Sequence, residues 1–157
     1  MRFFLLLIII SFAGSGCMKT RNSRELFFEA RVNGQLYIPQ SCANCITCTL
    51  LQDTILIFGG NRNDESLSIG ISDANGISPK TYQLTEKARL RGIYKNSTNY
   101  NDVFRTDSVN TGGFTVSAID RTRKIISGNF GFKAYNTYRG SSVEITRGKF
   151  RLNYTTY

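Results

Sequence analysis

Histidine is absent from this chain of 157 residues. Without an imidazole, the chain cannot build a Ser-His-Asp or Cys-His catalytic arrangement, and it lacks the most common general base and zinc ligand. No segment shows the 3.6-residue apolar stripe of an amphipathic helix, and beyond the N-terminus none is apolar enough to cross a bilayer. These absences argue against a hydrolase and against a helical fold, so we predict that the protein is not an enzyme.

The N-terminus has the pattern of an export signal. Arg2 is followed by an apolar run over residues 3–10 and by small residues at 13–16. A charged start, an apolar core of ~7–15 residues and small residues before the cut are typical of a secretory signal peptide. Cys17 comes next, where a bacterial lipoprotein is cut and acylated with fatty acids such as palmitate. We therefore predict that Cys17 is the lipidation site.

These features divide the chain into three parts: a signal peptide (1–16), a lipid-anchored tether (17–25) and a single β domain (26–157). Gly14 stands where lipoproteins usually have Leu or another aliphatic residue. The alternative is ordinary secretory cleavage nearby, with Cys17 left as a thiol. The leading prediction is a cell-envelope lipoprotein held at the membrane by several acyl chains. Its basic tether favours the outer membrane, facing the periplasm.

Alternating apolar and polar residues recur along the domain, with many β-branched and aromatic side chains. This period-two pattern predicts strands. Asn33-Gly34 is a strong hairpin signal, and the apolar run 54–58 predicts a strand buried on both faces. About ten short strands suggest an all-β fold, an antiparallel β-sandwich or small barrel built mostly of consecutive hairpins. The strands are expected near 28–32, 35–38, 54–58, 66–72, 81–84, 88–95, 102–106, 114–119, 125–136, 142–146 and 149–154.

Four motifs occur in a consistent order: Phe28-x-Ala30-x-Val32-Asn33-Gly34-x-x-Tyr37, Thr81-Tyr82-Gln83-Leu84, the aromatic run 126–136, and Val143-Glu144-Ile145-Thr146-Arg147-Gly148-Lys149-Phe150. Together they resemble a family of small uncharacterised Bacteroidetes lipoproteins over about residues 27–154. The resemblance implies an exported all-β domain of unknown function, with no catalytic residue or cofactor to carry over. The chain departs from that family in its cysteine cluster and its positive charge.

The same bacteria are similar in attaching O-glycans at Asp-Ser or Asp-Thr followed by an aliphatic residue. Two tripeptides fit this pattern, Asp53-Thr54-Ile55 and Asp107-Ser108-Val109. The resemblance therefore implies Ser108 and Thr54 as glycosylation sites. Ser108 is the better candidate, because it lies in a turn-rich segment where a bulky sugar can be exposed.

Three cysteines, Cys42, Cys45 and Cys48, form a tight cluster. In an oxidising envelope we expect a disulfide, either Cys42–Cys48 or Cys45–Cys48, and one leftover thiol. Zinc or an iron–sulfur cluster would need four ligands, so we predict no metal and no cofactor. A redox relay, in which the third thiol exchanges with the disulfide, is a further alternative.

The net charge of +9 favours acidic partners. For an exported chain these are anionic lipid, anionic glycan or an envelope protein, and not nucleic acid. Two groups of basic residues are candidates for anion binding: Lys87, Arg89, Arg91 and Lys95, and then Arg147, Lys149 and Arg151. If their strands share one sheet face, they form a cationic surface. The alternative is a solvated outer face whose charges discourage edge pairing.

The prediction for function is a non-enzymatic binding or structural module of the cell envelope. The alternative is a carrier of a small lipid or glycan, which requires an interior cavity of several hundred Å³. An envelope enzyme is the least favoured class, because it would need polar residues that converge in a cleft.

Overall fold

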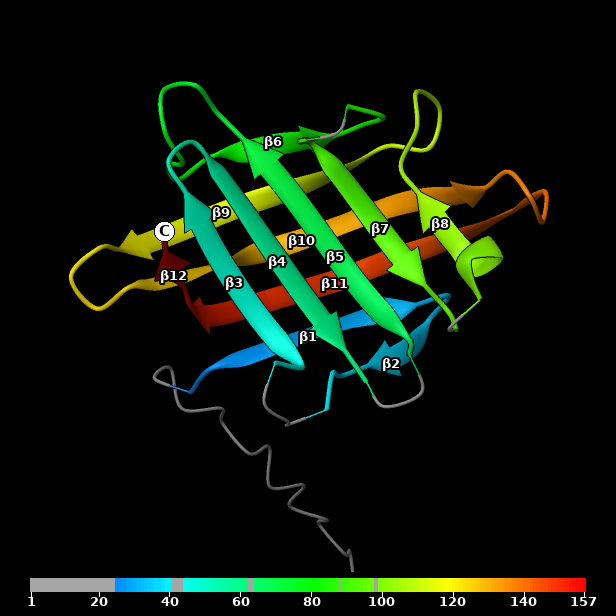
Figure 1. The fold of residues 1–157 in the computed structure, drawn as a ribbon, viewed down its shortest axis with the longest axis horizontal. Helices are drawn as coiled ribbons and strands as arrows, with labels where there is room; N and C mark the ends of the chain where they lie inside the picture. The colour runs from blue at the N-terminus through cyan, green and yellow to red at the C-terminus, as the bar shows by residue number, and fades with distance from the viewer. Residues whose placement is uncertain (1–24, 41–43, 62–63, 88, 98) are drawn as a thin grey trace, which may run out of the picture.

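The computed structural model describes residues 25–40, 44–61, 64–87, 89–97 and 99–157, and within them it consists of strands with one short 3-10 helix (Figure 1). The predicted all-β class is confirmed. No helix in these ranges is long and apolar enough to cross a membrane. The elements are β1 (Phe27–Val32), β2 (Gln35–Tyr37), β3 (Ile46–Leu51), β4 (Thr54–Gly60), β5 (Ser66–Ser72), β6 (Thr81–Leu84), β7 (Arg91–Lys95), η1 (Tyr100–Asp102), β8 (Val103–Arg105), β9 (Gly112–Asp120), β10 (Ile125–Asn136), β11 (Ser141–Asn153) and β12 (Thr155–Thr156).

Two layers of strands cross each other steeply in Figure 1. The front layer contains β3, β4, β5 and β7, and the back layer contains β6, β9, β10, β11, β1 and β2. β8 pairs with both β7 and β10, so the layers belong to one continuous sheet that folds over on itself. At the other side, β12 follows β11 after one residue and pairs in parallel with β3. The remaining pairings are antiparallel. Because the two layers are connected through β8 on one side and through β12 on the other, the fold is a barrel-like sandwich.

Local turn chemistry explains the first hairpin. Asn33 and Gly34 connect β1 to β2, and both have positive φ, 48° and 84°. A type I′ turn needs this left-handed backbone at its two central positions. The Arg31 guanidinium donates to the Gly34 carbonyl at 2.6 Å and closes the turn. This hairpin is where the sequence predicted it.

The C-terminal hairpin differs from the prediction. Two strands were expected, at 142–146 and 149–154, whereas β11 runs without interruption from Ser141 to Asn153. Arg147 has a φ of 52°, and the register against β10 shifts between Phe130 and Phe132. The turn-like Arg147-Gly148 pair thus forms a β-bulge that bends one long strand.

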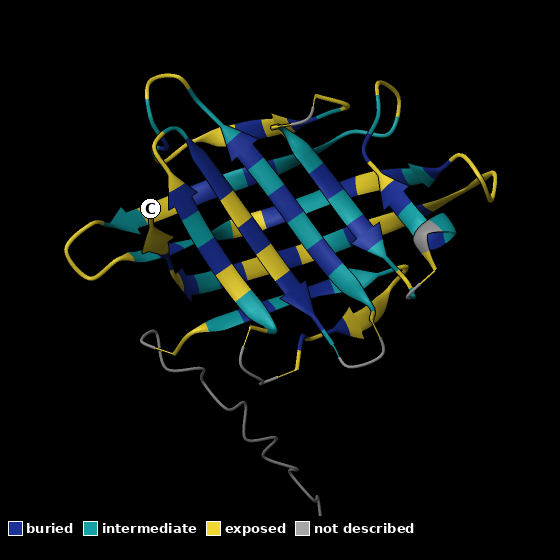
Figure 2. Cartoon of the chain, in the orientation of Figure 1, coloured by how far each residue is buried: buried dark blue, intermediate teal, exposed yellow. Residues whose placement is uncertain are grey.

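Stacked phenylalanine rings fill the space between the layers. Phe28 and Phe130 have centroids 5.3 Å apart, and Phe114 and Phe150 have centroids 4.9 Å apart. These side chains are buried, and each contributes roughly 1.5–3 kcal/mol through burial. Figure 2 shows the buried stripes alternating with exposed ones along the crossing strands. The protein's own side chains therefore fill the interior of the fold.

Candidate functional site

A groove crosses the outer face of the front layer, with a volume of about 380 Å³. Strand alternation creates its walls, because Ile55 and Ile57 of β4 point into the core while Leu56 and Phe58 point outward. Leu56 is 47% exposed and Phe58 is 36% exposed. The prediction of a strand buried on both faces is therefore wrong for β4, because nothing in the described structure covers its outer face. The other lining residues on this face are Thr47, Thr49, Ser68, Gly70 and Ile93.

Small residues form the floor of the groove. On β5 the outward positions are Ser66, Ser68, Gly70 and Ser72, while its apolar side chains point inward. Gly70 is paired with Leu56 on one side and with Arg91 on the other. A strip of short side chains therefore runs between the Leu56–Phe58 wall and β7. Sequence reasoning missed this groove, although a serine- and glycine-bearing strand face beside an apolar run was a signal for it.

Cations surround the β7 end of the groove. Ile93 is the register partner of Arg105 on β8, and the alternation of β7 places Arg91 and Lys95 on its same outward face. Arg91 and Arg105 also line an adjoining pocket of about 220 Å³, together with Tyr135 of β10. The surface therefore changes from apolar at Ile93 on β7 to cationic at Arg105, one strand away on β8.

Two acidic residues, Glu86 and Asp107, lie at the same pocket. The Asp107 carboxylate accepts hydrogen bonds from the backbone N–H groups of Val109 at 2.8 Å and Asn110 at 2.5 Å. These bonds, led by that of Asn110, lower the pKa of Asp107. The Arg91 guanidinium donates through one Nη to the Glu86 carbonyl, and its buried Nε has no hydrogen-bond partner. Both carboxylates thus share the pocket with Arg91 and Arg105, but none of the ion pairs among the described residues joins them to these arginines.

The two predicted basic groups do not form one surface. Lys87 and Arg89 lie in the turn before β7, because the strand begins only at Arg91. Arg91 and Lys95 face outward from the front layer. The residues of the second group, Arg147, Lys149 and Arg151, face outward from the opposite layer on β11. The prediction of a shared cationic face is thus not met, since the sheet folds over between β7 and β11. Instead, β7 brings Arg91 and Lys95 to Arg105, which the sequence analysis had not selected.

Arg151 lies in a separate pocket on the back layer, with a volume of about 450 Å³. Arg121 and Arg123 line the same pocket. Arg123 is paired with Asp120, and Arg121 donates to the Ile77 carbonyl at 3.2 Å. Arg123 is thus held within the β9–β10 turn and Arg121 by the loop between β5 and β6, while the buried Nε of Arg151 has no hydrogen-bond partner. The front-layer groove is the stronger candidate, because the exposed Leu56 and Phe58 line it.

The cysteine cluster differs from both pairings considered from the sequence. Cys45 is disulfide-bonded, whereas Cys48 is a free thiol buried in the core. Any pairing that uses Cys48 is therefore wrong, because the alternation of β3 turns this side chain inward. Cys42 and Cys17 lie outside the described residues. Burial raises the pKa of the Cys48 thiol to about 12, so it stays protonated at neutral pH and is a poor partner for disulfide exchange.

Metal binding at this cluster is disfavoured for the same reasons. A disulfide-bonded Cys45 has no thiolate to offer, and Cys48 is protonated. In the described ranges of the chain, no group of three His, Cys, Asp or Glu side chains is placed to hold a metal ion.

The two glycosylation candidates occupy opposite environments. Thr54 is 8% exposed, and its hydroxyl donates to the Asp53 carboxylate at 3.0 Å. A glycan could not be attached there without unfolding the start of β4. Ser108 is exposed at the tip of the loop that the Asp107 carboxylate organises. The structure therefore separates the two sites in favour of Ser108.

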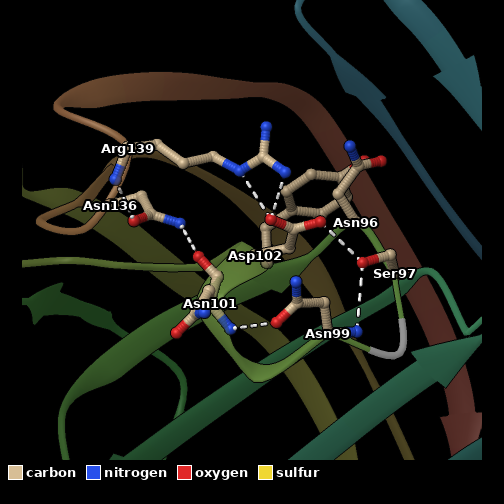
Figure 3. A network of polar contacts seen from close by, with 8 residues as sticks. Asn96, Ser97, Asn99, Asn101, Asp102, Asn136 and Arg139 are labelled. Atoms are coloured by element: carbon tan, nitrogen blue, oxygen red, sulfur yellow. Dashed lines mark hydrogen bonds and ion pairs between the residues drawn. The ribbon is translucent and has the colours of Figure 1, made fainter.

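A network of hydrogen bonds around Asp102 stabilises the position of β8 (Figure 3). The Asp102 carboxylate is buried and accepts hydrogen bonds from the Ser97 hydroxyl at 2.6 Å and from Arg139 Nε at 2.5 Å. The Ser97 bond and the Arg139 guanidinium lower the pKa of Asp102. Asn136 donates to the Asn101 carbonyl at 2.6 Å. The network joins the segment before β8 to the β10–β11 turn, and it thereby positions the strand that carries Arg105.

Comparison with known proteins places the chain in one family. The family described as "Domain of unknown function (DUF6252)" matches residues 25–152. No curated protein and no solved structure matches the chain.

Proposed function

We propose, for a chain that belongs to the DUF6252 family of domains of unknown function, a role as a non-enzymatic binding module of the bacterial cell envelope. Its export and anchoring rest on the leader before Cys17, and its resemblance to Bacteroidetes lipoproteins supports the same location. In this proposal the mature protein is held at the outer membrane, facing the periplasm, by lipid on Cys17.

The exposed groove on the front layer carries the binding role. Leu56 and Phe58 remain in contact with solvent, although their neighbours on β4 are among the most deeply buried side chains. Exposed apolar surface that lines a groove often marks a binding site, and Leu56 and Phe58 both line this one. The interior favours this outer surface over the carrier alternative, because the stacked Phe114 and Phe150 rings occupy the space that an enclosed ligand would need.

The polar clusters support a role without catalysis. The Asp102 carboxylate is engaged by Ser97 and Arg139. The Glu65 carboxylate accepts hydrogen bonds from the Tyr94 hydroxyl at 2.6 Å and from Asn61 at 2.7 Å. Both carboxylates stabilise loop contacts, and neither is presented at the groove, where a general base would have to meet a substrate.

Site-directed photocrosslinking in the native envelope tests the proposal. A photoreactive amino acid replaces Phe58 in the full chain, and a matched variant carries it at Leu36, which is 64% exposed on β2. A specific adduct at position 58 and none at position 36 is the expected result. Adducts of equal yield at both positions, or release of the chain from the membrane fraction without any adduct, would contradict the proposal.

A further inference from the structure

The structure points to a specific ligand class for the front-layer groove, and this inference rests on the proposed binding function. We infer that the groove holds a single long acyl chain whose anionic head group lies among Arg91, Lys95 and Arg105. The ligand is thus a fatty-acid anion bound on the outside of the fold.

The apolar part of the groove has the form that one hydrocarbon chain requires. The outward side chains form two rows across the strands. Thr47, Phe58, Ser68 and Ile93 are in register in one row, and Thr49, Leu56 and Gly70 are in register in the row beside it. Neighbouring strands are ~4.8 Å apart, so the groove spans roughly 14 Å from β3 to β7, and Arg105 on β8 lies one strand further along. A narrow apolar channel of this length fits an extended chain better than a compact apolar molecule.

An acyl chain in the groove would explain why residue 70 is a glycine. A Cβ added at Gly70 would meet only Leu56 Cδ2, at the ordinary contact distance of 3.4 Å, and its φ is not positive. Neither backbone conformation nor packing therefore requires glycine here. Glycine in a strand interior weakens the strand, and it often marks the close approach of a ligand. A side chain at position 70 would fill the channel between Leu56 and Arg91.

The charges fit an anionic head group. Ile93 has Arg91 and Lys95 on either side along β7 and Arg105 across from it. Among the described residues, the ion pairs are Lys80–Asp73, Arg123–Asp120 and Arg139–Asp102, so none of the three cations around Ile93 belongs to them. Guanidinium groups bind carboxylates through paired, charge-assisted hydrogen bonds.

The test uses the full chain in isolated cell envelopes. Hexadecanoate bearing a diazirine is added and irradiated, and the labelled peptides are mapped by mass spectrometry. Washed envelopes without added coenzyme A or ATP prevent enzymatic transfer of the probe to Cys17. Label concentrated on β4 and β7 is the expected result, whereas label spread evenly over both layers would overturn the inference.

Two pairs of matched variants sharpen the result. Gly70→Leu should abolish most of the labelling, while Gly113→Leu, on the outer face of the back layer with its nearest contact at 3.6 Å, should not change it. The double variant Arg91→Gln, Arg105→Gln should lower labelling about tenfold, in line with the loss of charge-assisted hydrogen bonds. The charge-matched variant Arg147→Gln, Lys149→Gln on β11 should label normally.

A neutral probe separates the head group from the chain. The diazirine alcohol of the same length should label β4 and β7 about tenfold less than the acid does, because it cannot pair with the arginines. Equal labelling by acid and alcohol would overturn the assignment of an anionic head. Labelling that Gly70→Leu leaves intact would overturn the groove as the site. If position 58 still crosslinks specifically to an envelope protein while hexadecanoate fails to label the groove, the ligand class is wrong and the binding module stands.

Discussion

Two glycines on opposite layers of the fold should respond in opposite ways to the same added methyl group. At Gly148, a Cβ would lie 2.4 Å from the Phe130 ring and 2.6 Å from the Phe130 carbonyl oxygen. The carbonyl oxygen is backbone and cannot rotate away. Overpacking of this kind costs about 1–3 kcal/mol, so Gly148→Ala should lower the free energy of unfolding by that amount.

Gly70→Ala is the matched substitution. Its Cβ meets only Leu56 at 3.4 Å, and alanine reduces the conformational entropy of the unfolded chain. Such substitutions raise the free energy of unfolding by about 0.4–1 kcal/mol. The two variants should therefore differ by about 1.4–4 kcal/mol, a large part of the ~5–15 kcal/mol that stabilises a typical domain.

Urea-induced unfolding provides the assay. The chain has 8 tyrosines and no tryptophan, so tyrosine fluorescence and circular dichroism report the transition. Equal midpoints for Gly148→Ala and Gly70→Ala would refute the reasoning, because they would mean that the Phe130 ring does not pack against the β11 backbone. A lower midpoint for Gly70→Ala than for the parent chain would equally remove the argument that position 70 has room for a side chain.

Four further outcomes are expected. The contacts that lower the pKa of Asp102 stabilise the folded chain fully at pH values above the ordinary Asp pKa of ~3.9. This stabilisation is lost as the pH falls through the lowered pKa. Asp102→Asn should therefore flatten that part of the curve of unfolding free energy against pH, measured by urea unfolding. The Cys48 thiol, whose pKa burial raises to about 12, should resist iodoacetamide at pH ~8 in the folded chain and react at once in urea. Mass spectrometry would detect the alkylated product. Rapid labelling without urea would contradict the burial of Cys48. The mass of the envelope-derived protein should exceed that of peptide plus lipid, and Ser108→Ala should remove the excess whereas Thr54→Ala should not. Cys17→Ser should abolish metabolic incorporation of a palmitate analogue and move the chain from the membrane to the soluble fraction.

Local chemistry accounts for the parts of the fold that sequence reasoning predicted well. The Asn33-Gly34 hairpin needs only two residues that tolerate positive φ, so the sequence signal is self-sufficient. Arg147-Gly148 carries similar turn chemistry, yet it forms a bulge inside β11. The difference is that β10 continues alongside β11 and supplies hydrogen-bond partners on both sides of the bulge. Turn residues indicate where a strand can bend, but the neighbouring strand decides whether it ends.

The candidate site was harder to predict because it depends on which faces are covered. Leu56 and Phe58 belong to an apolar run that resembles a strand buried on both sides. Burial on the second face requires another layer, and the sheet folds so that only the inner face of β4 receives one. The basic residues show the same effect, since alternation places Arg91 and Arg151 outward on opposite layers.

By itself, the amino-acid sequence determined the all-β class, the first hairpin and the alternation of side chains along most strands, because these follow from residue conformational preferences and a period of two. The prediction that Cys17 is lipidated also rests on the sequence alone, because it depends on a local residue pattern and not on the fold. Only the tertiary structure decided that Cys48 is buried and unpaired, that the two basic groups are separated, and that Ile93 meets Arg105 beside an open groove. These facts depend on contacts between segments far apart in the chain, and such contacts exist only once the sheet has folded over and its phenylalanine core has closed.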